Sequence, residues 1–287
     1  MNIAILINGP RGVHVIKNLR KINFVHIKSI VYSQKNKKKY FLKSLKKFKK
    51  KLNFFIDINS KKTEKFFRSL DLDLILIAGY SQILKGNILK LAKKFVINLH
   101  GGPANKYRGG SPLNWQIING ENNIGISLIK TDSGIDTGGI ISEKYFKLEH
   151  KDTIREVHLK ANKLFSVMIN KILKKIKFNQ DIKIKYQKKK GAYHFQRNDK
   201  DGEIKFKSMK SKDIYNFVRA ITHPYPGAWA YTNLDNKRKK IRVYECEVKK
   251  RIKNILKKDF FMINKKLYAK TLDYPVLLKK YAKYTSK

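Results

Sequence analysis

Two polar side chains near the middle of the chain could take part in proton transfer. Asn98 and His100 are separated by one residue, so on a β-strand both side chains point to the same face. Residues 101–103 (Gly-Gly-Pro) end that strand and open the space beyond it. An imidazole titrates near neutral pH and can accept or return a proton, and an amide N–H can donate to a developing negative charge. An isolated Asn-x-His pair is more often structural, so the surrounding sequence has to decide between the two interpretations.

Two further blocks follow this pair in a fixed order. The first is Lys-Tyr-Arg-Gly-Gly-Ser-Pro at residues 106–112, and the second is Ser-Gly-Ile-Asp-Thr-Gly-Gly-Ile at residues 133–140, which places Asp136 among glycines. Each glycine alone is explained as a turn former, and an acid among turn glycines can simply stabilise a loop. The ordered set of three blocks is improbable by chance and indicates a functional site.

Strands and helices are predicted to alternate along the first half of the chain. The predicted strands are residues 3–7, 24–32, 52–58, 72–78, 95–99, 124–130 and 139–146, and the predicted helices are 13–19, 34–51, one capped by 59–60, and a long one with Asp152 as its N-cap. Such alternation is typical of βαβ units around a mainly parallel sheet. Loops beyond the carboxyl ends of the strands are the expected place for a site.

The second half has a different pattern. Residues 176–190 are rich in Lys and weakly patterned, and we interpret them as a linker. Short strands are predicted at 193–195, 203–206, 229–232, 240–247, 260–263 and 266–271, with one helix at 211–221. We therefore predict an α/β fold: a Rossmann-like, mainly parallel sheet with helices on both faces in residues 1–178, then a small β-rich domain, OB-like or a partly open barrel, in residues 190–287.

The formal net charge of +45 invites a nucleic-acid interpretation. Of the 66 basic residues, however, 56 are Lys and 10 are Arg. Recognition of bases and phosphates through a planar fork of donors would favour Arg. We therefore interpret most of the Lys excess as a solvated surface, with the remainder available to attract a phosphate-bearing substrate.

The compartment is predicted from cysteine use and hydropathy. Cys246 is the single cysteine, so an internal disulfide is excluded, as suits a reducing cytoplasm. No apolar run approaches the roughly 20 residues needed to span a bilayer. Residues 1–7 are too short for a signal peptide and are predicted as a strand. We expect a cytoplasmic protein without a membrane partner.

The three blocks closely resemble the formyltransferase family, which uses 10-formyltetrahydrofolate and includes glycinamide ribonucleotide transformylase, methionyl-tRNA formyltransferase and sugar-nucleotide N-formyltransferases. The pattern of that family is Asn-x-His, then Tyr-Arg-Gly, then Asp-x-Gly, here with Asp136 lying 36 residues after His100. The resemblance implies an enzyme whose catalytic residues are Asn98, His100 and Asp136. His100 would be the general acid and base, Asn98 would stabilise the oxyanion, and Asp136 would orient the imidazole and favour its protonated form. It implies no metal.

The resemblance also implies binding residues. For the folate cosubstrate, 10-formyltetrahydrofolate, these are Gln82, Ile83, Leu84, Asp132, Ser133, Gly134 and Ile135, acting largely through the backbone. Core packing is an open alternative for Ile83 and Leu84. For the acceptor substrate they are Arg11, in a loop after the first strand, with Tyr107 and Arg108. A structural ion pair is an equal alternative for Arg108.

The likeness extends into the second domain, which narrows the choice of family member. Residues 197–202, 218–220 and 224–228 are similar to the family's C-terminal domain, which glycinamide ribonucleotide transformylase lacks. The basic insert typical of methionyl-tRNA formyltransferases is absent after Tyr32, whereas residues 112–115 (Pro-Leu-Asn-Trp) resemble sugar-nucleotide formyltransferases. We therefore expect a nucleotide-linked amino sugar as the acceptor.

Two departures from the family bear on that expectation. Residues 102–105 are Gly-Pro-Ala-Asn where most members have Ser-Leu-Leu-Pro. The enzyme that formylates UDP-4-amino-4-deoxy-L-arabinose carries an arginine at the position of Gly110, which argues against that sugar here.

Three alternatives stay open from the sequence. Methionyl-tRNA formyltransferase would make tRNA a partner, which is otherwise not expected. Hydrolysis of formyltetrahydrofolate would use water as the acceptor, and a decayed enzyme would be a non-catalytic nucleic-acid-binding protein. The resemblance is compatible with a homodimer, although the sequence identifies no interface. The sugar, the nucleotide, the amine position and the role of residues 248–287 are left undetermined.

Overall fold

The computed structural model describes residues 1–32, 44–187, 191–233, 238–250 and 259–284, which form two compact units. Unit 1 comprises Met1–Gly109, Gly125–Phe146 and His158–His194, and unit 2 comprises Gly110–Ile124, Lys147–Val157 and Phe195–Lys287. The units therefore interleave along the chain. The predicted domain boundaries, 1–178 and 190–287, stay a prediction, because compactness alone does not show that either part folds independently.

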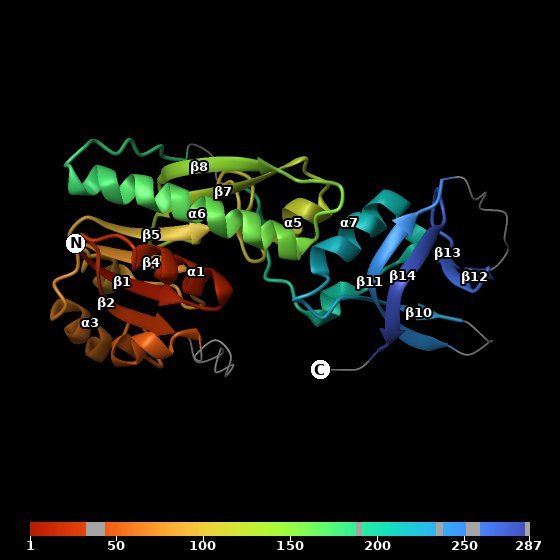
Figure 1. Cartoon of the computed structure of the whole chain (residues 1–287), viewed down its shortest axis with the longest axis horizontal. Helices are drawn as coiled ribbons and strands as arrows, with labels where there is room; N and C mark the ends of the chain where they lie inside the picture. The colour runs from red at the N-terminus through yellow and green to blue at the C-terminus, as the bar shows by residue number, and fades with distance from the viewer. Residues whose placement is uncertain (33–43, 188–190, 234–237, 251–258, 285–287) are drawn as a thin grey trace. The chain divides into compact units, whose positions relative to one another are not determined.

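Unit 1 is built around a seven-stranded sheet (Figure 1). Its strands are β1 (Asn2–Ile7), β2 (His26–Tyr32), β3 (Leu52–Phe54), β4 (Leu74–Ala78), β5 (Phe95–His100), β7 (Asn123–Lys130) and β8 (Ile140–Lys147), in the order β3-β2-β1-β4-β5-β7-β8. The first five strands pair in parallel, and β7 pairs antiparallel with β5. The predicted Rossmann-like, mainly parallel sheet is confirmed. A short parallel pair, β6 (Arg108–Gly109) with β9 (Tyr193–His194), lies outside this sheet.

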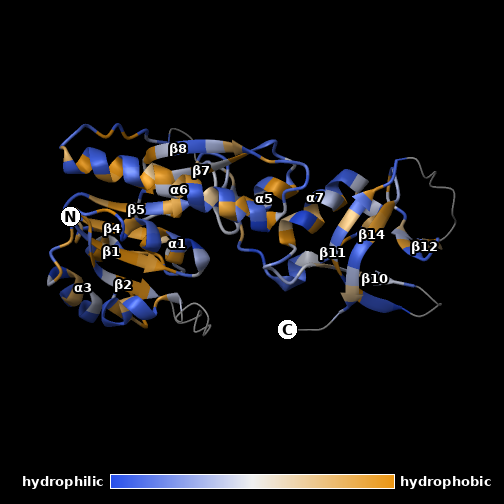
Figure 2. Ribbon diagram, viewed as in Figure 1, coloured by the Kyte–Doolittle hydropathy of each residue, from blue (hydrophilic) through white to orange (hydrophobic). Residues whose placement is uncertain are grey.

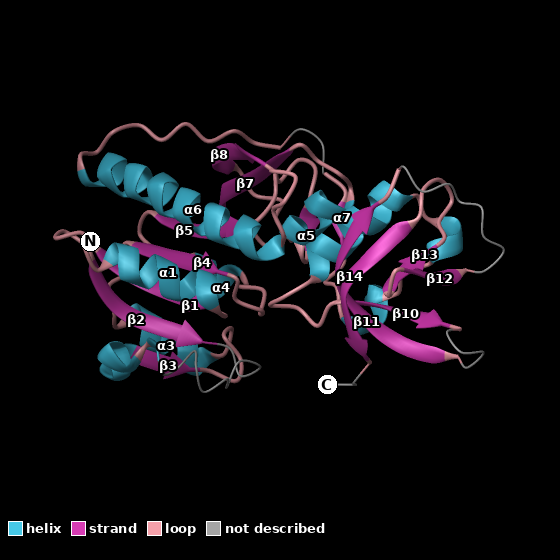
Figure 3. Ribbon diagram, turned by 45° about the vertical axis from the view of Figure 1, so that its right-hand side comes forward, coloured by secondary structure: helices cyan, strands magenta, loops and turns pink. Residues whose placement is uncertain are grey.

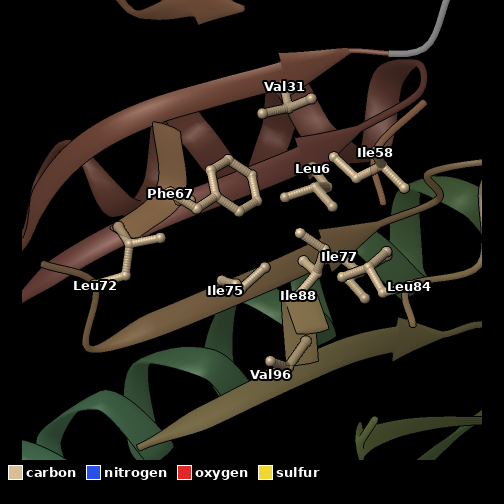
Figure 4. Packing of buried hydrophobic residues seen from close by; sticks show 11 residues of the cluster. Leu6, Val31, Ile58, Phe67, Leu72, Ile75, Ile77, Leu84, Ile88 and Val96 are labelled. Carbon is tan, nitrogen blue, oxygen red and sulfur yellow. The ribbon is translucent and has the colours of Figure 1, made fainter. Parts of the chain in front are cut away.

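Helices cover both faces of this sheet, as predicted (Figure 3). The helices are α1 (Pro10–Leu19), α3 (Lys61–Arg68), α4 (Gly86–Leu89) and α6 (Ile154–Lys177), with a 3-10 helix, η2 (Lys46–Lys51). Phe67 of α3 and Ile88 of α4 pack in one cluster with Leu6, Ile75 and other strand residues (Figure 4). Every residue of β4 is buried, as predicted for a central strand, and the middle strands are the most apolar part of the unit (Figure 2). This packing holds the carboxyl ends of the strands in fixed positions.

Unit 2 contains the predicted β-rich region. An antiparallel sheet has the order β10 (Ala228–Thr232), β11 (Lys239–Val248), β14 (Val276–Lys283), β13 (Lys266–Ala269) and β12 (Phe260–Ile263). The helices are α5 (Pro112–Ile118) and α7 (Ser211–Ile221), with 3-10 turns η3 (Asp199–Gly202) and η4 (Phe206–Ser208). The strand predicted at 203–206 is wrong, because only Glu203 bridges to Trp229 before η4 begins. Strand β14 was not predicted, since its second half carries charged, exposed residues.

Several predicted boundaries need correction. Ser60 caps α3 as predicted, accepting a hydrogen bond from the Thr63 amide at 3.3 Å. The N-cap predicted at Asp152 is wrong: α6 begins after Thr153, and Asp152 instead accepts from the Glu149 amide at 2.8 Å. The helix predicted at 34–51 lies partly outside the described residues. Within the described ranges, no helix combines the length and apolar character needed to cross a membrane.

Candidate active site

Asn98 and His100 are among the last residues of β5, which ends where the glycines begin. Asn98 pairs in register with Ile77 of β4 on one side and with Ile129 of β7 on the other. Asp136 comes from the loop that joins β7 to β8. Asn98 Nδ2 donates to Asp136 Oδ1 at 2.8 Å, and His100 Nδ1 lies 3.3 Å from Asp136 Oδ2. The fold thus brings the three predicted catalytic residues into one contiguous group.

The His100 ring is enclosed, with 4% of its side chain exposed. Its Nε2 lies 2.5 Å from the backbone oxygen of Tyr107, so both ring nitrogens face oxygen acceptors. Burial lowers the pKa of His100, the charge of Asp136 and the Tyr107 carbonyl act in the opposite direction, and the Arg11 charge adds to the lowering. Asp136 therefore favours the protonated ring as expected, but burial outweighs it. The resting ring is therefore neutral. When it takes up a proton, each of its two N–H groups has an oxygen acceptor.

The loop that carries Asp136 is held tightly. Asp136 has a left-handed backbone, with φ of 53°, which is costly for a residue with a side chain. Its Oδ2 also accepts from the Gly109 amide at 3.0 Å. Asp132 Oδ1 accepts from the Gly134 amide at 3.0 Å and the Thr137 hydroxyl at 2.7 Å, which closes the loop on itself. The carboxylate of Asp136 is therefore placed by its surroundings rather than by local backbone preference.

Gly138 is expected to be irreplaceable in this loop. A Cβ at Gly138 would lie 1.8 Å from the backbone oxygen of Lys130, which cannot yield without moving β7. We expect Gly138→Ala to destabilise the protein by about 1–3 kcal/mol and to displace Asp136 from His100. Chemical denaturation and a formyl-transfer assay measure the two effects.

Gly86→Ala is the matched control, because a Cβ at Gly86 meets no atom within 4 Å. It should leave both the free energy of unfolding and the activity close to wild type. A Gly138→Ala protein as stable and active as the Gly86→Ala protein would contradict the tight loop described above.

Some of the residues predicted to bind folate make contacts within the protein, and others are exposed. Gln82 ties two loops together, since its Oε1 accepts from the Ile58 amide at 2.9 Å and its Nε2 donates to the Ile56 carbonyl at 3.1 Å. Leu84 is buried in the core, whereas Ile83 is 55% exposed. In the second segment the Asp132 carboxylate is engaged within the loop, while Ser133 is exposed, Gly134 is half-buried and Ile135 is 40% exposed. Their contact with folate stays a prediction.

The residues predicted to bind the acceptor make internal contacts in this structure. Arg11 lies in the first turn of α1 rather than in a loop; its Nη1 donates to the Leu99 carbonyl at 3.0 Å and its guanidinium lies 5.1 Å from the Phe165 ring centre. Arg108 Nε donates to the Gly191 carbonyl at 2.9 Å. Tyr107 is buried. Direct roles for these three in substrate binding stay predictions.

One residue beside the site was not predicted. Gln187 donates from Nε2 to the backbone oxygens of Asp136 at 2.9 Å and Gly138 at 2.8 Å. It lies in the Lys-rich segment that we interpreted as a linker, where no apolar periodicity marks a structural role. Among the described residues, His, Cys, Asp and Glu do not gather in groups of three or more that could hold a metal ion. The absence of a metal stays a prediction.

Comparison with known proteins places these features in a family. Residues 1–172 match the formyl transferase family, and residues 197–258 match its C-terminal domain. A bifunctional polymyxin resistance protein, ArnA, from Wigglesworthia glossinidia brevipalpis is 38% identical over 197 residues, which are 67% of this chain and 30% of that protein. A methionyl-tRNA formyltransferase from Caldanaerobacter subterraneus subsp. tengcongensis is 33% identical over 181 residues, 63% of this chain and 57% of that protein.

The fold has a solved counterpart over nearly its whole length. The N-formyltransferase from Helicobacter canadensis, solved in complex with folinic acid and dTDP-3-aminofucose, superposes with a TM-score of 0.71 at 19% identity, covering 98% of this chain and 99% of that one. At this identity the likeness shows the fold. The chain spans less than two thirds of the length of these two curated relatives. The match to the family over more than half of the sequence shows more than the fold: this chain belongs to the formyl transferase family.

Proposed function

We propose that this enzyme transfers the formyl group of 10-formyltetrahydrofolate to the primary amine of a nucleotide-linked amino sugar. The observation that carries the proposal is the convergence of Asn98, His100 and Asp136 at the carboxyl end of β5. The acceptor class is supported by the Helicobacter canadensis structure with its dTDP-linked amino sugar, and by the Pro-Leu-Asn-Trp run at the start of α5.

Asn98 is placed to stabilise the oxyanion. Attack of the amine on the formyl carbon moves an electron pair onto the formyl oxygen. One N–H of the Asn98 amide is used by Asp136, so the amide is held in place with its second N–H available for that oxygen. Removing one such donor costs roughly 3–4 kcal/mol of transition-state stabilisation in known enzymes.

His100 moves the proton. The attacking nitrogen becomes positively charged and must lose a proton, and the leaving nitrogen of the folate must gain one as its bond to the formyl carbon breaks. The neutral imidazole accepts the first proton and returns it to the leaving nitrogen. With Nδ1 donating to Asp136, the basic lone pair is on Nε2, and the Tyr107 carbonyl can accept from Nε2–H once the ring is charged.

The folate would bind against residues 82–84 and 132–135, where exposed residues lie next to residues that make contacts within the protein. Gln82 and Asp132 fix these two segments through their own hydrogen bonds, which leaves the backbone and the exposed Ile83 and Ile135 for a planar, partly apolar ligand. We also propose that the enzyme works in the reducing cytoplasm, where a free thiol such as that of Cys246 is the usual state of cysteine.

The test is release of tetrahydrofolate from 10-formyltetrahydrofolate, followed spectrophotometrically with a panel of acceptors. We expect turnover with one or more dTDP- or UDP-linked amino sugars and none without an acceptor. Formate release in the absence of any amine would replace the proposal with hydrolysis. Turnover confined to methionyl-tRNA would replace it with the function considered next.

Methionyl-tRNA is the second candidate acceptor, because the Caldanaerobacter relative carries that name and the chain has a net charge of +45. Binding to tRNA through many lysines would release counterions, so affinity would fall steeply as salt rises. A formylation rate with amino-sugar nucleotides that is insensitive to tRNA and to moderate salt favours the leading proposal.

A further inference from the structure

A short segment after α6 lies against the loop that carries Asp136. We define residues 184–187 as the strap. Lys185 and Ile140 exchange two backbone hydrogen bonds, at 2.8 Å and 2.9 Å, which ties the strap to the start of β8. A Cβ at Gly139 would lie 2.3 Å from Ile184 Cγ2, so the strap packs directly on the loop where the chain has no side chain.

Gln187 ends the strap with a two-pronged contact. Its Nε2 donates both of its hydrogens, one to the Asp136 carbonyl at 2.9 Å and one to the Gly138 carbonyl at 2.8 Å. Backbone carbonyls only accept hydrogen bonds, so the amide nitrogen, not the amide oxygen, must face them. The chemistry of the two partners therefore fixes the orientation of the side chain.

The contact falls where the loop is under strain. Asp136 has a positive φ, and such a conformation persists only when neighbouring groups hold it. The two carbonyls that Gln187 binds lie on either side of Thr137, so the amide fixes the peptide planes just after Asp136. The Asp136 carboxylate meets Asn98 at 2.8 Å and His100 at 3.3 Å.

We propose that Gln187 is a positioning residue for the formyl-transfer reaction: it holds the Asp136 backbone so that the carboxylate meets both Asn98 and His100. The proposal rests on the proposed catalytic role of Asp136. Gln187 acts through Asp136, since its amide nitrogen is used by the two carbonyls of the loop. The strap is thus part of the catalytic apparatus even though its sequence has the character of a linker.

Two substitutions separate the effect of the donor from that of the side chain's bulk. Gln187→Met keeps the length and removes the donor, and Gln187→Glu puts acceptors against two carbonyls. Because small misplacements of catalytic groups are costly, we expect kcat to fall by about 10- to 100-fold in Gln187→Met and further in Gln187→Glu. The KM values for folate and acceptor should stay within about two-fold, since the proposed role of Gln187 acts on Asp136 and not on substrate binding.

The pH profile gives a readout that a purely structural role would not change. Asp136 raises the pKa of His100 against the effect of burial. Once Asp136 is displaced, that contribution weakens, so the acid limb of kcat/KM should move to lower pH in Gln187→Met. NMR titration of the His100 ring, assigned through loss of its signal in His100→Ala, measures the same shift directly and does not depend on activity.

Gln180→Met is the matched control, because Gln180 is an exposed glutamine seven residues earlier in the same segment. It should match wild type in kcat, KM, pH profile and thermal unfolding. A Gln187→Met protein that is less stable but keeps the wild-type kcat and pH limb would overturn the inference. If Gln187→Met does not fold, the same comparison is made with Gln187→Glu, which has nearly the shape of the native side chain.

Asp136→Asn distinguishes failure of the inference from failure of the proposed function. If Asp136→Asn is inactive while both Gln187 variants fold and behave as wild type, the positioning role alone is wrong. If Asp136→Asn retains full activity, the proposed catalytic group is wrong and the role of Gln187 falls with it.

Discussion

Replacing His100 with alanine is expected to lower kcat/KM for formyl transfer by about 10³-fold, within the range that general acid–base catalysis contributes. In the proposed mechanism, the variant lacks the group that takes the proton from the attacking amine and returns it to the leaving nitrogen. Because the return of the proton to the leaving nitrogen is lost as well, kcat should fall while the KM for folate changes little. Steady-state release of tetrahydrofolate, with the amino-sugar acceptor identified by the panel, measures both constants.

His26→Ala is the control for this substitution, since His26 is an exposed histidine on β2. It should retain the wild-type rate. Thermal unfolding of both variants shows whether the cavity left by the buried His100 ring has disturbed the fold. A folded His100→Ala protein with activity within ten-fold of wild type would exclude His100 as the acid–base group.

The pH dependence of the wild-type enzyme follows from the same ring. Burial lowers the pKa of His100 from its ordinary value of 6.5, so the neutral, basic form persists below that pH. As pH falls through the lowered pKa the ring becomes protonated before it meets the amine, and kcat/KM decreases. The acid limb is therefore expected below pH 6.5, and its absence from His100→Ala would assign it to this residue.

The parts of the site that the sequence predicts are those set by local pattern. The apolar run of β5 ends at glycines, which places Asn98 and His100 side by side at the end of the strand, and the ordered blocks supply Asp136. The contacts of Gln187 and Arg11 could not be predicted, because each joins its side chain to a backbone carbonyl far away in the sequence. Such pairings depend on the tertiary fold and leave no periodicity in the chain.

Dependence on the tertiary fold also explains why a predicted helix boundary was wrong. Asp152 has the residue type of an N-cap, but Thr153 takes that position and bonds to Glu156 through both its amide, at 3.0 Å, and its hydroxyl. Either residue satisfies the sequence rule, and the choice depends on how the preceding turn packs.

The packing around Gly110 bears on the acceptor that we propose. A Cβ at Gly110 would lie 2.4 Å from Gln196 Cα and 2.5 Å from Gln196 N, so no side chain fits there unless the backbone of residue 196 moves. The arginine that the resemblance associates with UDP-4-amino-4-deoxy-L-arabinose is thus excluded by packing as well as absent from the sequence. This favours a different amino sugar as the acceptor.

Asp136→Asn is expected to cause a loss comparable to that of His100→Ala, although the side chain keeps its shape. In the native site Oδ2 accepts from the Gly109 amide at 3.0 Å and lies 3.3 Å from His100 Nδ1. An amide nitrogen at that position would set a donor against the Gly109 N–H, while an amide oxygen there would put the nitrogen against the Asn98 donor. Either orientation breaks a hydrogen bond that the carboxylate satisfies.

The substitution also changes which ring nitrogen of His100 carries the proton. Without a carboxylate at Nδ1, the neutral ring favours the tautomer in which Nε2–H donates to the Tyr107 carbonyl, and Nε2 then has no lone pair for the amine's proton. We expect kcat to fall by about 10³- to 10⁴-fold, since replacing the carboxylate of a catalytic triad by an amide lowers kcat by about 10⁴-fold. Asp181→Asn is the matched control, because Asp181 is an exposed aspartate outside the site. Equal, wild-type activity of the Asp136→Asn and Asp181→Asn proteins would show that the charge of Asp136 has no part in the reaction, whereas a loss confined to Asp136→Asn would support the role of this carboxylate in setting the tautomer of His100.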